Sequence, residues 1–307
     1  MIDYSGLNVE QLEAVASSHP RILALAGAGT GKTRVLTHRI ASLWENGTST
    51  KNILALTFTR AAGVEMKERV ISLIGNDGKG LFADTFHAFC ADLIRENASD
   101  LGYEPNFSIY DQAECDETMK DVLQGLKYKI PLTRIADFRA GKTERMLPTD
   151  LKQAKRAFKE YEFRLKRNNA FDFDGLIGTA RKAIIERPQI RLSLKEKYKH
   201  VFVDEFQDTD SRQWQIVAGF EPENLFITGD DFQSIYGFRG SEVGIILGLA
   251  QSKNWQVIKL EQNYRSTAPI VEAANALLRL SRNSYSLKAL SACLRSAGSI
   301  FSVFPAR

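Results

Sequence analysis

The stretch RILALAGAGTGKTR, residues 21–34, passes from an apolar run into a glycine-rich turn and then into a helical pattern. A strand, a glycine-rich loop and a helix N-terminus in this order form a setting that binds phosphate groups. Gly27, Gly29 and Gly31 let successive N–H groups turn toward phosphate oxygens. Lys32 would reach the β and γ phosphates, and the Thr33 hydroxyl would ligate Mg²⁺. The residues predicted to bind a nucleotide here are Ala26, Gly27, Ala28, Gly29, Thr30, Gly31, Lys32 and Thr33.

A second stretch, ADFRAGKT at residues 136–143, satisfies the same relaxed pattern. It has one glycine, no apolar strand precedes it, and Pro148 limits the helix that follows. The pattern alone is therefore weak evidence, and its context decides. We predict no phosphate site at this second stretch.

The composition indicates an ordinary globular protein. Of 307 residues, 44% are hydrophobic and 25% are charged, which argues against disorder and suggests two domains or one domain with a large insertion. We expect no membrane span and no secretory signal, because no long apolar run occurs and the N-terminus lacks a basic-then-apolar pattern. Cys90, Cys115 and Cys293 are far apart and odd in number, which predicts buried thiols in a cytoplasmic protein.

Six short runs rich in Ile, Leu, Val and Phe predict strands buried on both faces, as in a parallel sheet. They are residues 22–26, 53–57, 81–84, 201–204, 225–228 and 257–260. Helical patterns at 34–44 and 61–74 follow the first two runs. In the second pattern the residues expected on the buried face are Val64, Val70, Ile71 and Ile74. This alternation predicts an α/β fold.

Between about residues 86 and 195 the sequence is long, charged and mostly helical in period. Strand signals resume after it, so it is interpreted as a helical domain inserted into the sheet. Residues 120–169 hold 14 lysines and arginines against six acidic residues, a local net charge of +8. This excess predicts a polyanion partner, although a solvated helical face would have the same composition.

Carboxylates end one of the predicted strands, in VFVDEFQD at residues 201–208. A nucleotide hydrolase needs one carboxylate to hold Mg²⁺, here Asp204, and another to orient water, here Glu205. Ligands of doubly wound sheets lie at the carboxyl ends of strands, which would place this pair near Lys32. A strand end with two acids is usually only solvated, but its pairing with a phosphate loop favours the catalytic interpretation.

Two further segments follow strands, TGDDFQSIYGFRG at 228–240 and KLEQNYRST at 259–267. Gln233 is placed to sense a γ-phosphate, and Arg265 to act as an arginine finger. Tyr236 and Phe238 are suited to stacking on unpaired bases, although both rings would serve equally well in a core. Tyr264 is suited to stacking on a purine.

Taken in order, these segments resemble superfamily 1 DNA helicases of the UvrD/Rep/PcrA type. Further segments carry the resemblance: the Leu7–Ala14 segment is similar to the family's adenine-reading motif, LTFTR at 56–60 and TFHAF at 85–89 to its single-strand contact motifs, and DFDGLI at 172–177 to the close of its helical insertion. The resemblance implies a RecA-like parallel sheet of the P-loop NTPase class. Its domains would be 1–86 with 196–282, a helical insertion at 87–195, and the start of a second RecA-like domain at 283–307.

The resemblance also implies roles for single residues. Gln11 would contact adenine, and Arg34 and Tyr264 would flank the base. Lys32, Asp204, Glu205, Gln233 and Arg265 would carry ATP hydrolysis, with Mg²⁺ on Thr33 and Asp204. The residues expected to contact DNA are Phe58, Thr59, His87, Tyr236 and Phe238. Arg60, Gly63, Phe232 and Gly237 depart from the family pattern, which affects the DNA contacts rather than ATP binding.

The predicted function is that of the ATP-binding half of an ATP-dependent 3′–5′ DNA helicase, because residues 268–307 resemble none of the family's later motifs. Its partners would be single-stranded or 3′-tailed duplex DNA and repair or replication proteins, with no membrane. One alternative is a non-catalytic DNA- or protein-binding module with a vestigial nucleotide site. Another is a helicase–nuclease relative, but no nuclease carboxylate cluster is found in the sequence.

Overall fold

The computed structural model describes residues 2–144, 146–230, 233, 243–280 and 291–292. The chain divides into two compact units, one of Met1–Phe86 with Arg191–Arg307 and one of His87–Ile190. The sequence placed the end of the insertion at residue 195, whereas the second unit ends inside helix α10 (Pro188–Lys197). The predicted start of a second RecA-like domain at 283–307 falls almost wholly outside the described residues.

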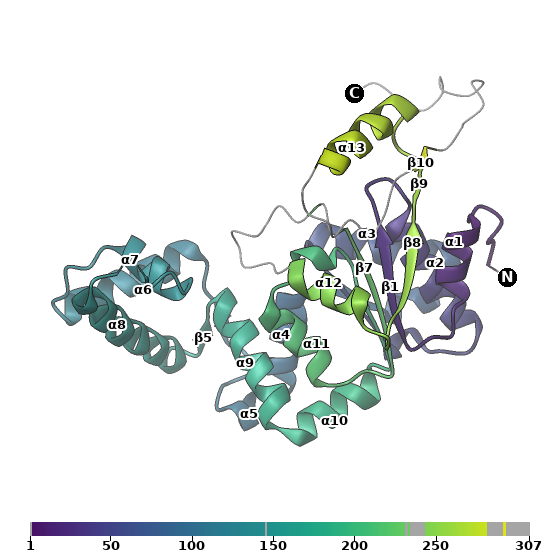
Figure 1. Ribbon diagram of the computed structural model, residues 1–307. Helices are drawn as coiled ribbons and strands as arrows, with labels where there is room; N and C mark the ends of the chain where they lie inside the picture. Colours follow the sequence, from purple (N-terminus) through teal and green to yellow (C-terminus); the bar gives the residue numbers. More distant parts are fainter. Residues whose placement is uncertain (1, 145, 231–232, 234–242, 281–290, 293–307) are drawn as a thin grey trace, which may run out of the picture. The chain divides into compact units, whose positions relative to one another are not determined.

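The first unit is built on a six-stranded sheet in which neighbouring strands are all parallel (Figure 1). Its order is β3-β2-β6-β7-β1-β8. The strands are β1 (Arg21–Ala26), β2 (Ile53–Thr57), β3 (Phe82–Thr85), β6 (His200–Val203), β7 (Asn224–Gly229) and β8 (Gln256–Leu260). Each coincides with one of the six predicted runs within one or two residues, which confirms the α/β, RecA-like fold.

Helices cover both faces of this sheet. One hydrophobic cluster joins the sheet to α1 (Val9–Ala16), α2 (Lys32–Glu45) and α3 (Arg60–Ile74). Figure 1 shows α11 (Ser211–Gly219) and α12 (Val243–Gln251) on the opposite side. Right-handed crossovers explain this division, because the chain moves one way from β1 to β2 and β3, and the other way from β6 to β7 and β8.

Further elements complete the first unit. They are η1 (Thr50–Asn52), η2 (Gly75–Gly80), η3 (Phe206–Asp208), α13 (Ala268–Leu280) and a two-stranded parallel pair, β9 (Gln262–Asn263) with β10 (Ser291–Ala292). The element η3 follows β6 directly, and β9 follows β8 directly. Both therefore begin at the carboxyl edge of the sheet, where the phosphate loop also begins.

The buried face of α3 differs from the predicted one. Its buried residues are Gly63, Met66, Val70 and Ile74, whereas Val64 is 49% exposed. A Cβ at position 63 would lie 2.8 Å from the carbonyl oxygen of Ala83, so the absence of a side chain lets α3 approach β3 closely. The prediction was wrong about Val64 because a glycine gave no signal of facing the core.

The second unit is mainly helical. Its elements are α4 (Phe86–Glu96), α5 (Ala98–Leu101), α6 (Gln112–Gly125), α7 (Leu132–Arg139), α8 (Pro148–Arg167), α9 (Phe173–Glu186) and the parallel pair β4 (Ser108–Ile109) with β5 (Ala170–Phe171). Asp172 accepts from the Tyr161 hydroxyl at 2.8 Å and from Arg139 at 2.5 Å, and it caps α9 through the Gly175 amide. One buried carboxylate therefore holds α7, α8 and α9 together.

The described cysteines behave as predicted. Cys90 and Cys115 are free and buried, and burial raises the pKa of both thiols, while Cys293 lies outside the described residues. No helix in the described part of the chain has the length and apolar character needed to cross a membrane.

Candidate nucleotide-binding site

The phosphate loop joins the end of β1 to the start of α2, as the sequence predicts. Gly29 and Gly31 have φ of +75° and +87°, in the left-handed region that favours glycine. Space also requires glycine: a Cβ on Gly29 would lie 2.5 Å from Arg265 Cβ, and one on Gly31 would lie 2.7 Å from Gln11 Nε2. The loop is therefore a cradle of backbone groups at a helix N-terminus, which fits a phosphate ligand.

Gly27 differs from the other two glycines of the loop. It is buried, and its φ is not positive. Its carbonyl accepts from the Thr30 hydroxyl at 2.8 Å and from the Thr30 amide at 3.4 Å. The sequence predicted that all three glycines let the loop turn, and positive φ is found at the second and third of them. The chain turns at Gly27 through hydrogen bonds to Thr30, and the left-handed conformations come later, at Gly29 and Gly31.

Gln11 braces this loop from α1. Its side chain is almost fully buried and donates from Nε2 to the Thr30 carbonyl at 2.9 Å. Its Oε1 accepts from the Asn8 amide at 3.0 Å in a capping box that begins α1. The other end of α1 is held by buried Arg39 of α2, which donates to the Ala14 and Val15 carbonyls. Burial lowers the pKa of Arg39 to about 10.

Lys32 and Glu205 form the central ion pair of the site. Lys32 Nζ lies 2.6 Å from Glu205 Oε2, and the lysine side chain is only 10% exposed. Glu205 itself has φ of +51°, an uncommon conformation for a residue with a side chain. Backbone strain of this kind is typical of functional positions. A triphosphate that uses Lys32 has to share it with Glu205 or displace Glu205.

Asp204 is the buried member of the two adjacent carboxylates, Asp204 and Glu205. Its Oδ1 accepts from the Thr228 hydroxyl at 2.5 Å and from the Glu205 amide at 3.0 Å. Burial raises its pKa, and the negative charge of Glu205 raises it further. Because β6 and β7 are neighbours in the sheet, Thr228 at the end of β7 reaches Asp204 just past the end of β6.

Gln207 links the acidic residues to Gln233. Its Nε2 donates to Glu205 Oε2 at 2.7 Å, and its Oε1 accepts from the Asp230 amide at 2.9 Å. Asp230 Oδ2 in turn accepts from Gln233 Nε2 at 2.5 Å. The sequence singled out Glu205 and Gln233 but missed Gln207, Thr228 and Asp230. No sequence pattern distinguished these side chains from other polar residues, because their contacts with the carboxylates exist only in the fold.

Asp208 adds a third carboxylate to this edge. Its Oδ1 is buried without a hydrogen-bond partner. Burial, together with the charge of Glu205, raises its pKa to about 6. Within the described residues no cluster of three or more His, Cys, Asp or Glu side chains could enclose a metal ion. The carboxylates at this edge of the sheet nevertheless fit Mg²⁺, because this ion commonly takes one or two carboxylates together with phosphate oxygens and water.

The remaining predicted nucleotide residues lie beside the loop. The Tyr264 amide donates to the Gly29 carbonyl at 2.8 Å, and exposed Arg265 follows it. Arg34 is exposed on the first turn of α2, with its guanidinium against the Gly6 backbone. The structure therefore brings the predicted nucleotide residues to one edge of the sheet.

The predicted DNA residues are only partly described. Phe58 is 37% exposed just after β2, and Thr59 caps α3 by accepting from the Ala62 amide at 3.2 Å. His87 belongs to the second unit, where its ring meets Phe173 edge-on at 5.2 Å. Tyr236 and Phe238 lie outside the described residues.

A parallel sheet with a phosphate loop after β1 and paired acids after β6 defines the class of P-loop nucleotide-binding proteins. Residues 7–254 match the family model of the UvrD/REP helicase N-terminal domain, and the chain belongs to this family. It is similar to the ATP-dependent DNA helicase PcrA of Staphylococcus aureus, with 38% identity over 290 residues, and to that of Staphylococcus epidermidis, with 39%. Each match covers 89% of this chain and 40% of the relative, so the chain spans about two-fifths of the relatives' length.

Proposed function

We propose that the chain is the ATP-binding half of an ATP-dependent 3′–5′ DNA helicase that acts on single-stranded DNA in repair, replication or recombination. The main support for this proposal is the ion pair in which Lys32 Nζ lies 2.6 Å from Glu205 Oε2. A phosphate-binding cation and a water-orienting carboxylate come from segments far apart in the sequence. Their meeting supports hydrolysis of a nucleotide rather than binding alone.

Each residue has a proposed part at the phosphates. Lys32 binds the β and γ phosphates, and Glu205 orients the attacking water and accepts its proton. Thr33 and Asp204 hold Mg²⁺, which when bound neutralises negative charge on the phosphate oxygens. Gln233 and Arg265 contact the γ-phosphate. The hydrogen bonds that link Glu205 through Gln207 and Asp230 to Gln233 support this assignment, because they couple the orientation of Glu205 to the position of Gln233.

The base would lie between Arg34 and Tyr264, with Gln11 contacting adenine. The Gln11 amide already bonds Asn8 and Thr30, so an adenine contact would use its second N–H and its second lone pair. Adenine binding and support of the phosphate loop would then depend on one side chain.

Tests of this proposal begin with nucleotide binding and turnover by the chain itself. We expect Mg²⁺-dependent ATP binding, but neither helicase-like turnover nor unwinding. The helicase family uses a second arginine finger and a second motor domain, and an arginine finger is worth about 10³–10⁵ in rate. Steady-state ATPase and a forked-duplex assay measure both activities. DNA-stimulated turnover above about 1 s⁻¹, near the low end of ordinary enzyme rates, contradicts the proposal.

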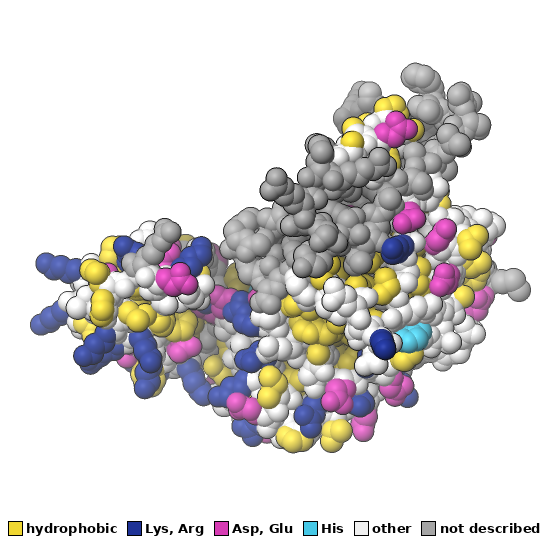
Figure 2. Space-filling model, in the orientation of Figure 1, with side chains coloured by type: hydrophobic (Ala, Val, Ile, Leu, Met, Phe, Trp, Pro, Cys, Tyr) yellow, Lys and Arg dark blue, Asp and Glu magenta, His cyan; other side chains and the backbone are white. Residues whose placement is uncertain are grey.

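A basic face on α8 supports DNA as the partner. Its six exposed cations are Lys152, Lys155, Arg156, Lys159, Lys166 and Arg167. At 100° per residue they fall within about one-third of the helix circumference, over about 22 Å of its length. Phe163, 60% exposed, lies among them. Figure 2 shows the dark-blue side chains that gather along this part of the second unit. We therefore favour the polyanion partner over a merely solvated face.

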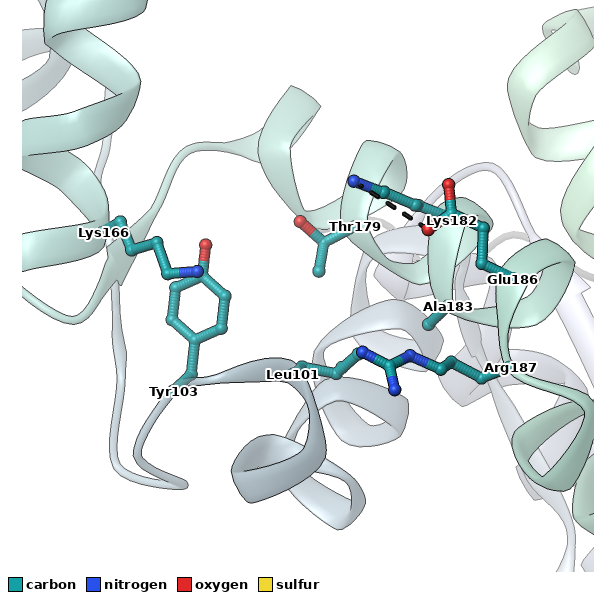
Figure 3. Close-up of a pocket in the computed structure, with 8 residues that line it drawn as sticks. All are labelled: Leu101, Tyr103, Lys166, Thr179, Lys182, Ala183, Glu186 and Arg187. Carbon is teal, nitrogen blue, oxygen red and sulfur yellow. Dashed lines mark ion pairs between the residues drawn. The ribbon is translucent and has the colours of Figure 1, made fainter.

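Lys166 also lines a pocket of about 290 Å³, and further cations line this pocket. Figure 3 shows Lys166 and Arg187 extending into it from opposite sides, with Tyr103 beside Lys166. Lys166 Nζ lies 5.2 Å from the centre of the Tyr103 ring, and Lys182 contacts Glu186 at 3.9 Å. With three cations and one carboxylate in its lining, the pocket fits a backbone phosphate of the same strand.

The DNA proposal is tested by reversing charge on α8. The triple variant Lys152→Glu, Lys155→Glu, Lys159→Glu should bind a single-stranded oligonucleotide at least about 10-fold more weakly, with a salt slope shallower by about 2. The control variant reverses three exposed lysines of the first unit, Lys51, Lys79 and Lys253. Equal loss in both variants would show that net charge, not the α8 face, matters. DNA binding without any nucleotide binding would favour the vestigial-site alternative.

A further inference from the structure

The phosphate loop is tied to the segment that follows β8 by two adjacent contacts. Asn263 Nδ2 donates to the Ala28 carbonyl at 2.7 Å, and the Tyr264 amide donates to the Gly29 carbonyl at 2.8 Å. Two successive peptide groups of the loop are therefore held from the same side of the site. Neither contact was foreseen from the sequence, which singled out Tyr264 only for its ring.

The other end of the Asn263 amide fixes the turn that carries the arginine. Asn263 Oδ1 accepts from the Arg265 amide at 2.9 Å and from the Ser266 amide at 2.7 Å. Asn263 is only 4% exposed. An asparagine has a donor and an acceptor on one short side chain, whereas ionised aspartate has acceptors only. One buried amide thus joins the loop to the backbone of Arg265.

The hydrogen bond to the Ala28 carbonyl also orients the Gly29 N–H, because the peptide group that contains both is planar. The Ala28 carbonyl and the Gly29 N–H belong to one planar group and point in opposite directions. A carbonyl held by Asn263 therefore turns the Gly29 N–H to the other side of the peptide. Because glycine has wide conformational freedom, a released peptide before Gly29 would rotate easily and remove that N–H from a phosphate.

Contact distances show how closely the two segments approach. A Cβ on Gly29 would lie 2.5 Å from Arg265 Cβ and 3.2 Å from both amide atoms of Asn263. The loop and the Arg265 turn are therefore in direct contact. Their relative position is set by the Asn263 amide and the Tyr264 backbone.

We propose that Asn263 is a positioning residue, which presets the Ala28–Gly29 peptide for a phosphate and holds the Arg265 turn against the loop. This inference rests on the proposed nucleotide site. It assigns to Asn263 a mechanical coupling: movement of the Arg265 segment is transmitted to the phosphate-binding backbone.

Two variants separate the contact that the Asn263 amide donates to the loop from the contacts that it accepts from the Arg265 turn. Asn263→Asp removes the donor and keeps the acceptor, whereas Asn263→Ala removes both. Both should weaken binding of a fluorescent ATP analogue by about 10-fold, corresponding to about 1.4 kcal/mol. In the nucleotide-free protein, hydrogen exchange at the Arg265 and Ser266 amides should accelerate in Asn263→Ala but remain slow in Asn263→Asp. A loss of general stability would accelerate exchange throughout the first unit.

Controls make each failure distinguishable. Asn254→Asp, an exposed residue of the same unit, adds the same charge and should bind as wild type. If wild type itself does not bind the analogue, the proposed function is wrong. If wild type binds and Asn263→Ala binds equally well, the positioning role is wrong, and weak binding of Asn263→Asp alone would then reflect only its charge.

Discussion

Residues 26–33 and 136–143 share a sequence pattern but have opposite local structures. The first stretch leads into the first turn of α2, where a helix N-terminus has a positive partial charge. The second spans the end of α7, where the charge is negative. Its Gly141 also has positive φ, but the N–H groups of residues 140–143 donate to nearby carbonyls at that helix end. In the first stretch the carbonyls of residues 27–30 all accept hydrogen bonds, and of the N–H groups of the same residues only that of Thr30 is recorded as donating, to the Gly27 carbonyl at 3.4 Å. A phosphate needs donors, so the order of strand, loop and helix decides between them.

The largest expected difference concerns the two lysines. Lys32→Ala should weaken ATP binding by about 10- to 100-fold, because it removes a charge-assisted contact worth about 1.5–3 kcal/mol. Lys142→Ala, at an exposed position of the second stretch, should leave the affinity unchanged. Titration of a fluorescent ATP analogue measures both. Equal affinities for wild type and Lys32→Ala would end the assignment of the first stretch.

The glycines give the next comparison. Gly31→Ala should destabilise the fold by about 1–3 kcal/mol and weaken ATP binding, because it combines a left-handed φ with a clash against Gln11. Gly141→Ala has the same φ problem but nothing within 4 Å of the new Cβ. It should cost about 1 kcal/mol and leave ATP binding intact. Urea unfolding and ATP titration separate the two effects, and parallel loss of ATP binding would contradict the comparison.

The ion pair between Lys32 of the first stretch and Glu205 leads to a smaller effect, an increase in ATP affinity. Glu205→Gln removes the charge that holds Lys32 at 2.6 Å and that would repel a triphosphate. ATP affinity should therefore rise by about 3- to 10-fold while hydrolysis falls. Calorimetric titration with Mg²⁺-ATP measures the change. Weaker binding would show that Glu205 supports the nucleotide rather than competing with it.

The smallest effect is one of pH. The pKa of Asp208 is about 6 in the folded protein and ordinarily 3.8, so the folded state holds the proton more tightly. This group's stabilising contribution is complete below about pH 4 and is lost as pH rises through about 6. Asp208→Asn should raise Tm at pH 8 by roughly 2–4 °C, with solvent screening limiting the gain to about 1 kcal/mol. Little difference should remain at pH 4, and a pH-independent shift would refute this origin.

The sequence predicted what depends on local order. All six sheet strands were found because strands buried on both faces have continuous apolar runs. Lys32, Asp204 and Glu205 followed from motifs at strand ends. Long-range side-chain contacts were missed, as with Asn263 and Gln207, because an asparagine or glutamine has no distinctive pattern until the fold supplies its partner. Val64 was misplaced for a related reason: the residue that faces the core there is Gly63, which has no apolar side chain to indicate it.

Nucleotide binding is assigned to the strand-preceded stretch at residues 26–33 and not to the similar stretch at 136–143. Hydrogen exchange of the whole chain, measured with and without saturating Mg²⁺-ATP, tests this assignment most directly. We expect slower exchange in residues 27–33, with further protection at 204–208 and 263–266, and no change in residues 136–143. Protection of residues 136–143, or unchanged exchange in residues 27–33 at saturation, would contradict it.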